Sequence, residues 1–221
     1  MTCNLILPPN IKKLESKVEE LAGFQITYIL DPSIAGNLMS EFENGLPIIR
    51  YRGNMDVEGV AHELLHLKLQ TQGYHSLKSW PEKRFTSLAA LILLNVVQHH
   101  IIFPILEGWG FNPKKQECAG TQELLLGLLE LKLPLDTPCL CPPFAMLYVR
   151  GMLDCNDTDL HHCFISFFDN KLLVRAREMA VSLINRIKLF NKIAPGEYNS
   201  TLNDCISILG LAGDIEIATH I

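Results

Sequence analysis

The spacing of hydrophobic residues over the first fifty positions predicts one helix followed by strands. Residues 8–22 carry apolar residues at three- and four-residue intervals with charged residues between them, as in an amphipathic helix. Residues 24–30 and 46–51 are rich in β-branched and aromatic residues, so both predict strands. Asn44-Gly45 is a hairpin signal that joins the last strand to the weakly alternating residues 37–43. We therefore expect a helix followed by a small antiparallel sheet.

Pro47 bears on which strand lies at the edge of that sheet. Proline has no main-chain donor, so it is tolerated on an edge strand or at the start of a strand. An edge strand beside the next helix would let an extended peptide add to the sheet by main-chain hydrogen bonding. The pattern thus predicts a place where a peptide substrate could bind.

Beyond residue 56 the apolar pattern predicts helices almost throughout. The expected helices cover residues 57–72, 81–103, 116–131, 143–153, 159–168, 171–193 and 200–211. Pro104 is expected to end or kink the second of them, and residues 72–83 and 107–115 are expected as loops. The fold class is therefore α+β and mostly α. We expect a core over residues 1–112 and a helical extension over residues 113–221 packed on it, or one continuous domain.

One stretch has the length and hydrophobicity of a membrane span. Residues 88–106 are almost entirely apolar, but they include Asn95, Gln98, His99, His100 and Pro104. Polar and helix-breaking residues of this kind are unfavourable in a lipid-facing helix. We therefore expect a buried helix of a soluble protein, with a membrane-associated enzyme as the alternative.

The helix expected over residues 57–72 contains His62-Glu63-Leu64-Leu65-His66, an H-E-x-x-H motif. A four-residue spacing puts both imidazoles on one helix face, where together they can bind one zinc ion. Glu63, next to the first ligand, can act as general base for a zinc-activated water. Such a motif arises by chance with a probability of roughly 2% in a chain of this size and composition. Two histidines on a mostly apolar helix would also be costly to bury without a metal.

Catalytic zinc takes three protein ligands and leaves one position open, so the motif needs a third residue. His99, on the next apolar helix, is the first candidate, and Asn95 one turn earlier could orient a ligand or the substrate. Glu82 is the alternative and would give a site of two histidines and one glutamate. The remaining alternatives are Glu107, Glu117 and Glu123.

Three further residues are candidates for contact with a substrate. His100 follows His99 but points about 100° away from it on a helix, so it is a weaker ligand candidate. It could instead contact the substrate or stabilise an oxyanion. Tyr74 and His75 lie in the loop expected after the motif helix and are possible substrate contacts, although such residues often only cover the edge of a core.

In its order of elements the chain resembles a minimal gluzincin-type zinc peptidase, and most of all the ImmA/IrrE family of small bacterial metallopeptidases. The resemblance covers roughly residues 1–110. It rests on His62-Glu63-Leu64-Leu65-His66 after a strand pair, and on Glu82 followed by Leu88-Ala89-Ala90 and Ile92-Leu93-Leu94. It implies a zincin fold, zinc-dependent hydrolysis and Glu82 as a metal ligand. It further implies a transcriptional repressor as the protein substrate.

Composition narrows the partners and the compartment. The net charge is −5 and no basic run occurs, so nucleic-acid binding is not expected. The N-terminus lacks the pattern of a secretory signal, and an odd count of 7 cysteines suits reduced thiols in the cytoplasm. A second metal site is an open alternative for one cysteine group, although its spacings fit no common zinc motif. That group comprises Cys139, Cys141, Cys155 and Cys163.

Two functions of different classes follow from these observations. The first is a zinc metallopeptidase that hydrolyses a peptide bond in a protein, with Glu63 as general base and His62, His66 and His99 as ligands. The alternative is a zinc-binding regulatory or interaction module with the same fold and no turnover. In that case the helical C-terminal half would bind a partner protein.

Overall fold

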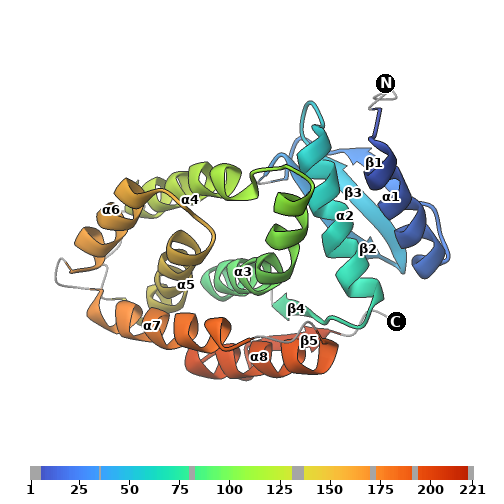
Figure 1. Ribbon diagram of the computed structural model, residues 1–221. Helices are drawn as coiled ribbons and strands as arrows, with labels where there is room; N and C mark the ends of the chain where they lie inside the picture. Colours follow the sequence, from blue (N-terminus) through green and yellow to red (C-terminus); the bar gives the residue numbers. More distant parts are fainter. Residues whose placement is uncertain are drawn as a thin grey trace. The chain divides into compact units, whose positions relative to one another are not determined.

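A computed structural model describes residues 6–34, 36–79, 83–130, 137–169, 173–190 and 194–218. The fold is α+β and mostly α, as the hydrophobic pattern predicts. The chain forms two compact units (Figure 1). The described part of the first spans residues 6–75 and 104–111, and that of the second spans most of residues 76–103 and 112–218.

The first unit contains helices α1 (Pro9–Ala22) and α2 (Val57–Thr71) and a three-stranded sheet. The strands are β1 (Thr27–Leu30), β2 (Leu38–Glu43) and β3 (Leu46–Tyr51). The two helices contact each other, and α2 packs on β2 while α1 touches β3. The core of this unit forms where the apolar faces of the helices meet the sheet, around Ile11, Val18, Ile49 and Leu64, none of which is exposed.

The sheet of the first unit differs from the expected antiparallel arrangement. Its order is β1-β3-β2, and β1 runs parallel to β3 while β2 runs antiparallel to it. The hairpin prediction is confirmed, because Asn44 and Gly45 have φ angles of 52° and 81°, the left-handed pair that a tight hairpin requires. The return strand β3 is central, so Pro47 lies near the start of an interior strand. The edge strand that packs on α2 is β2.

The second unit is built mainly of helices. They are α4 (Pro113–Glu130), a short 3₁₀ turn η1 (Pro138–Leu140), α5 (Cys141–Leu153), α6 (Thr158–Asp169), α7 (Val174–Lys188) and α8 (Pro195–Ile208). Helix α5 is central, because α4, α6 and α7 all pack against it. Of the ten residues of α5 from Pro142 to Gly151, all but Arg150 are buried. Aromatic rings of α5 and α6 interlock at this interface, including Tyr148 against Phe168 with ring centres 4.9 Å apart.

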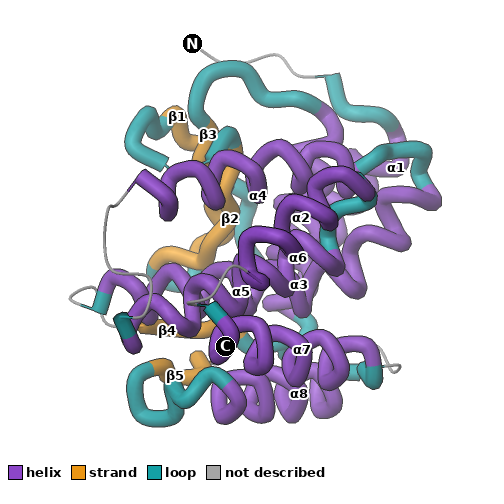
Figure 2. Tube along the Cα trace, turned by 90° about the vertical axis from the view of Figure 1, so that its left-hand side faces the viewer, coloured by secondary structure: helices purple, strands orange, loops and turns teal. Residues whose placement is uncertain are grey.

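A second sheet in this unit was not predicted. Residues 76–79, expected in a loop, form β4 (Ser76–Ser79), which pairs antiparallel with β5 (Ile215–Ala218). Figure 2 shows the two strands side by side. Each strand is only four residues long, so neither carries a periodic pattern that separates it from a loop. Their stability comes from pairing with a partner remote in sequence.

Helix α3 (Arg84–Gly108) is longer than expected. Its predicted start at residue 81 falls outside the described residues. The prediction ended it at Phe103, whereas the helix continues through Pro104 and takes in Glu107. A proline removes one hydrogen bond from the helical ladder, and here the surrounding bonds hold the helix together.

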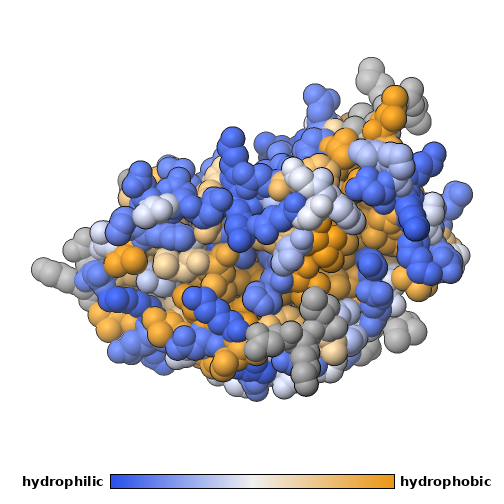
Figure 3. Space-filling model, in the orientation of Figure 1, coloured by the Kyte–Doolittle hydropathy of each residue, from blue (hydrophilic) through white to orange (hydrophobic). Residues whose placement is uncertain are grey.

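Among the described residues, α3 is the one helix long and apolar enough to cross a membrane, over Phe85–Gly108. In its most apolar window 61% of the residues are buried, as in the core helix of a globular unit. Residues such as Leu91, 52% exposed, interrupt this burial. Hydrophobic side chains also reach the surface elsewhere, interspersed with hydrophilic ones (Figure 3).

Candidate metal centre

Helix α2 carries the H-E-x-x-H motif and is fixed in place by a capping hydrogen bond and by buried side chains. Asp56 precedes the helix, and its side chain accepts a hydrogen bond of 2.7 Å from the main-chain N–H of Gly59. This cap satisfies a donor that the first turn would otherwise leave without a partner. Val60, Leu64 and Leu67 are fully buried on the same helix. The backbone that carries both histidines is therefore anchored at its start and along its length.

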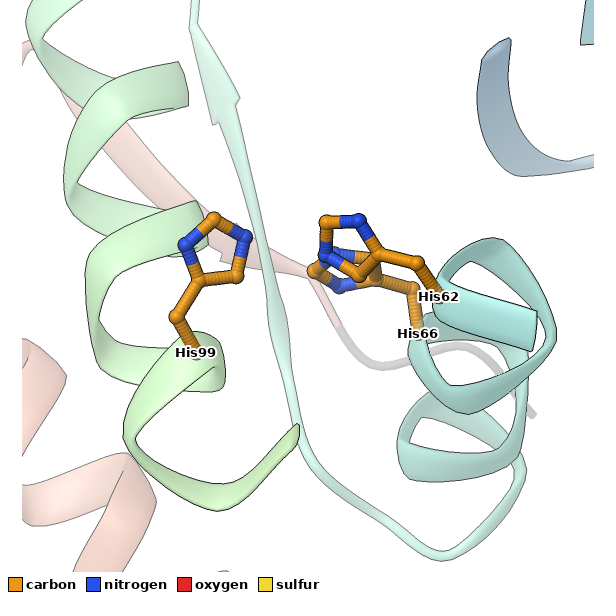
Figure 4. A group of neighbouring side chains, drawn as sticks. All are labelled: His62, His66 and His99. Atoms are coloured by element: carbon orange, nitrogen blue, oxygen red, sulfur yellow. The ribbon is translucent and has the colours of Figure 1, made fainter. Parts of the chain in front are cut away.

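His62 and His66 lie side by side on α2, and Figure 4 shows their rings projecting from the same side of the helix. Their Nε2 atoms are 3.0 Å apart, and the ring centres are 4.7 Å apart with a 39° angle between the planes. Two imidazoles on one tetrahedral zinc, with Zn–N bonds of 2.0–2.1 Å, have nitrogens roughly 3.3 Å apart. The pair therefore needs to open by only a few tenths of an ångström to bind one ion.

The two histidines differ in exposure. His66 is 6% exposed, whereas His62 is only half-buried, and so is Glu63. A metal bound by this pair would thus be held from the interior by His66 and reached from outside beside His62. Glu63 follows His62 in the sequence, and its partial exposure leaves the side chain accessible to solvent.

His99 lies on α3 in the second unit and is 1% exposed. Its Nδ1 is 2.8 Å from Oδ2 of Asp154, the residue that ends α5. Its ring stacks on Phe103, one turn further along α3, with ring centres 4.3 Å apart and planes inclined by 20°. A buried hydrogen bond and a stacked ring together determine the orientation of the imidazole. The sequence prediction did not include Asp154.

A buried ion pair adjoins His99 and Asp154. The guanidinium of Arg150 on α5 donates hydrogen bonds to Glu117 Oε2 on α4, one of them 2.9 Å long, and both side chains are 13% exposed. Burial lowers the pKa of His99 to about 4, so the imidazole is neutral at pH 7, the form that binds a metal. Burial, followed by the charge of Glu117, raises the pKa of Asp154 well above its usual range, and Arg150 counters this rise.

Two groups of the described residues have the ligand types of a metal site. One comprises His62, His66 and His99, and the other comprises His99, Glu117 and Asp154. In the second group, whose ligand atoms lie within 4.8 Å of one another, Arg150 already neutralises Glu117 and a cation would have to compete with it. The second group is therefore better described as a hydrogen-bonded network. In the first group, His62 and His66 belong to the first unit and His99 to the second.

The structure places the other candidate residues as follows. His100 lies within hydrogen-bonding distance of the main-chain oxygen of Phe190, with Nε2 at 3.1 Å. Asn95 is half-buried one turn before His99, Tyr74 is 5% exposed, and His75 is half-buried. Glu107 and Glu123 are exposed on helices α3 and α4. Glu82, the alternative third ligand, lies outside the described residues.

The cysteines do not form a ligand group within the described part of the chain. Cys139 and Cys163 are exposed, Cys141 is half-buried and Cys155 is buried, and neither candidate metal group includes any of them. Burial raises the pKa of Cys155 to about 12, so this thiol is protonated at neutral pH. A second metal site at these residues is not supported by their placement.

Comparison with family models, curated proteins and solved structures finds no match to this chain.

Proposed function

We propose that this chain is a zinc-dependent metallopeptidase in which His62, His66 and His99 bind the metal and Glu63 is the general base. The observation that carries the proposal is the 3.0 Å separation of the Nε2 atoms of His62 and His66 on a buried, capped helix. Two neighbouring imidazoles with their ring nitrogens this close have the geometry of a chelating pair. The small sheet followed by this helix is also the order of elements in a minimal zincin core.

His99 is the proposed third ligand on the strength of its own surroundings. Its Nδ1 is engaged by Asp154, so Nε2 is the atom that would bind the metal. Its burial keeps it neutral, as a ligand must be. The resemblance to the ImmA/IrrE family favours Glu82 in the same role, and the experiment below separates the two.

When bound, zinc lowers the pKa of a coordinated water and polarises the carbonyl oxygen of the scissile peptide. Glu63 accepts the proton of the attacking water and delivers it to the leaving amine. The half-buried position of Glu63 suits this exchange, because it leaves the side chain partly accessible to solvent. His62, on the more open side of the pair, would border the position that the substrate occupies.

The substrate class follows from the first unit. Strand β2 is an edge strand and packs on α2, so an extended segment of a protein could pair with it beside the motif helix. We therefore propose a protein or peptide substrate, and a cytoplasmic location consistent with the cysteine usage. A repressor-like substrate is what the ImmA/IrrE resemblance would add.

The first test is the metal content of the purified protein and of two variants. We expect about one zinc per chain in the wild type, retained in Glu82→Ala and lost in His99→Ala. The reverse pattern would replace His99 by Glu82 and strengthen the ImmA/IrrE resemblance. No zinc in any form, with zinc added back, would refute the proposal.

Turnover is tested separately with a mixed library of fluorescence-quenched peptides. We expect Glu63→Gln to keep its zinc and to lose hydrolysis, because an amide cannot accept the proton of water. Equal rates for the zinc-loaded wild type and Glu63→Gln would exclude Glu63 as the base. Stoichiometric zinc without cleavage of any peptide would favour a zinc-binding regulatory or interaction module, in which the helical second unit binds a partner.

A further inference from the structure

Asp154 forms a buried hydrogen bond with His99, although it is not itself one of the proposed metal ligands. Asp154 is 3% exposed and ends α5, with its main-chain N–H bonded to the oxygen of Arg150. A carboxyl group is rarely buried so deeply unless a specific partner compensates for the loss of water. The partner is the Nδ1 of His99, at 2.8 Å, and both side chains belong to the second unit.

The geometry points to Asp154 as a positioning residue that orients His99 so that Nε2 is its zinc-binding atom. This inference rests on the proposed function, and it assigns a role to a residue on an element with no recognisable motif. A neutral imidazole has one donor and one acceptor nitrogen. If Nδ1–H donates to the carboxylate of Asp154, Nε2 is the acceptor and therefore the ligand atom. Metal-binding histidines commonly use this arrangement, in which a carboxylate fixes both the tautomer and the ring orientation.

Neighbouring contacts hold the elements that carry the pair. Arg150 lies one helical turn before Asp154 on α5, and its guanidinium donates a hydrogen bond to Glu117 on α4. This ion pair links α4 to the last turn of α5, just before Asp154. Phe103, on the same helix as His99, stacks on the imidazole and fixes its ring plane. The imidazole is thus held by a hydrogen bond at one atom and by a ring at its face.

The tautomer of His99 can be read without any metal. In long-range ¹H–¹⁵N spectra of the metal-free full chain, we expect His99 to carry its proton on Nδ1. The signal is assigned by its loss in His99→Ala. An Nε2-protonated His99 in the wild type would overturn the inference, whether or not the protein binds zinc.

Zinc affinity, measured by competition with a chromogenic chelator, tests the consequence. We expect Asp154→Asn to weaken zinc binding about 10- to 100-fold, the usual effect of removing a carboxylate partner of a ligand histidine. The matched control is Thr121→Val on α4. It removes a buried hydroxyl group and leaves the shape of the side chain nearly unchanged. This control should bind zinc like the wild type. An Asp154→Asn variant that also matches the wild type would overturn the inference while leaving the zinc site intact.

A double variant separates positioning from general damage to the fold. His99→Ala should lose its zinc on purification but still bind added zinc weakly through His62 and His66. If Asp154 acts through His99, then Asp154→Asn should not weaken this residual binding any further. An equal loss in both backgrounds would mean that Asp154 supports the structure as a whole, and the positioning role would be rejected. Failure of the wild type to bind zinc would refute the proposed function, and the tautomer measurement would still decide how Asp154 orients His99.

Discussion

Replacing Gly151 with alanine should destabilise the protein through a contact between α5 and α6. A Cβ atom at this position would lie 2.8 Å from Cε2 and 2.9 Å from Cδ2 of Phe164, which is fully buried and has no room to turn. Overpacking of this kind costs about 1–3 kcal/mol, and the better helix propensity of alanine returns up to ~1 kcal/mol. We expect a net loss of about 1–2 kcal/mol, which corresponds to a fall in Tm of about 2–8 °C for a chain of this size.

The matched control is Gly127→Ala on α4, where an added Cβ would meet no heavy atom within 4 Å. Here only the helix propensity changes, so we expect a gain of up to ~1 kcal/mol and a Tm higher by up to about 4 °C. Thermal unfolding followed by circular dichroism compares the two variants with the wild type. A Gly151→Ala variant as stable as Gly127→Ala would show that α5 and α6 are not packed as closely as described.

Three further outcomes can be checked by unfolding measurements. Asp56→Ala removes the cap on Gly59 and should cost about 1 kcal/mol in urea unfolding, whereas Asp56→Asn should retain most of the stability; equal losses would exclude the cap. Tyr28→Phe removes a 2.6 Å hydrogen bond to Glu15 and should cost about 1–2 kcal/mol. Burial raises the pKa of Tyr28 in the folded state. The stability that comes from this shift is therefore complete below pH 10 and is lost as pH rises above it. If the free energy of unfolding of the wild type and of Tyr28→Phe changed equally with pH above 10, this reasoning would be contradicted. Zinc at a hundred times its Kd should add about 2.7 kcal/mol to the wild type and nothing to His66→Ala, and an equal shift in both would place the metal elsewhere.

The elements whose formation depends on residues close together in the chain could be predicted from the sequence. The helix over residues 8–22 became α1 at Pro9–Ala22, and the Asn44-Gly45 turn joins β2 to β3 as expected. The parallel pairing of β1 with β3 was missed, because strand order depends on contacts that the pattern of one strand does not contain. The continuation of α3 through Pro104 was missed for a related reason, since tertiary packing can outweigh a local breaker.

Only the part of the candidate site that depends on local spacing could be predicted from the sequence. The spacing of His62 and His66 is local, and their proximity on one helix face follows from the helical repeat alone. Asp154 comes 55 positions after His99 and lies just beyond a predicted helix. Nothing in the chain around it distinguishes it from an ordinary surface aspartate at a helix end. A buried hydrogen bond between two such residues follows from the packing of α3 against the end of α5, which the sequence does not reveal.

The pairing of β4 with β5 affects the order in which the chain folds during its synthesis. Ser76 is bonded in register with Ala218, so β4 has no strand to pair with until the last described residues have left the ribosome. Helices α4 to α8 lie between these strands in sequence and can form as they emerge, since their contacts are more local. The second unit, which contains His99 and Asp154, is therefore completed only after Ala218 has emerged. A nascent chain would carry the H-E-x-x-H helix for some time before the proposed third ligand has its final surroundings, so the proposed zinc site would form only after that point.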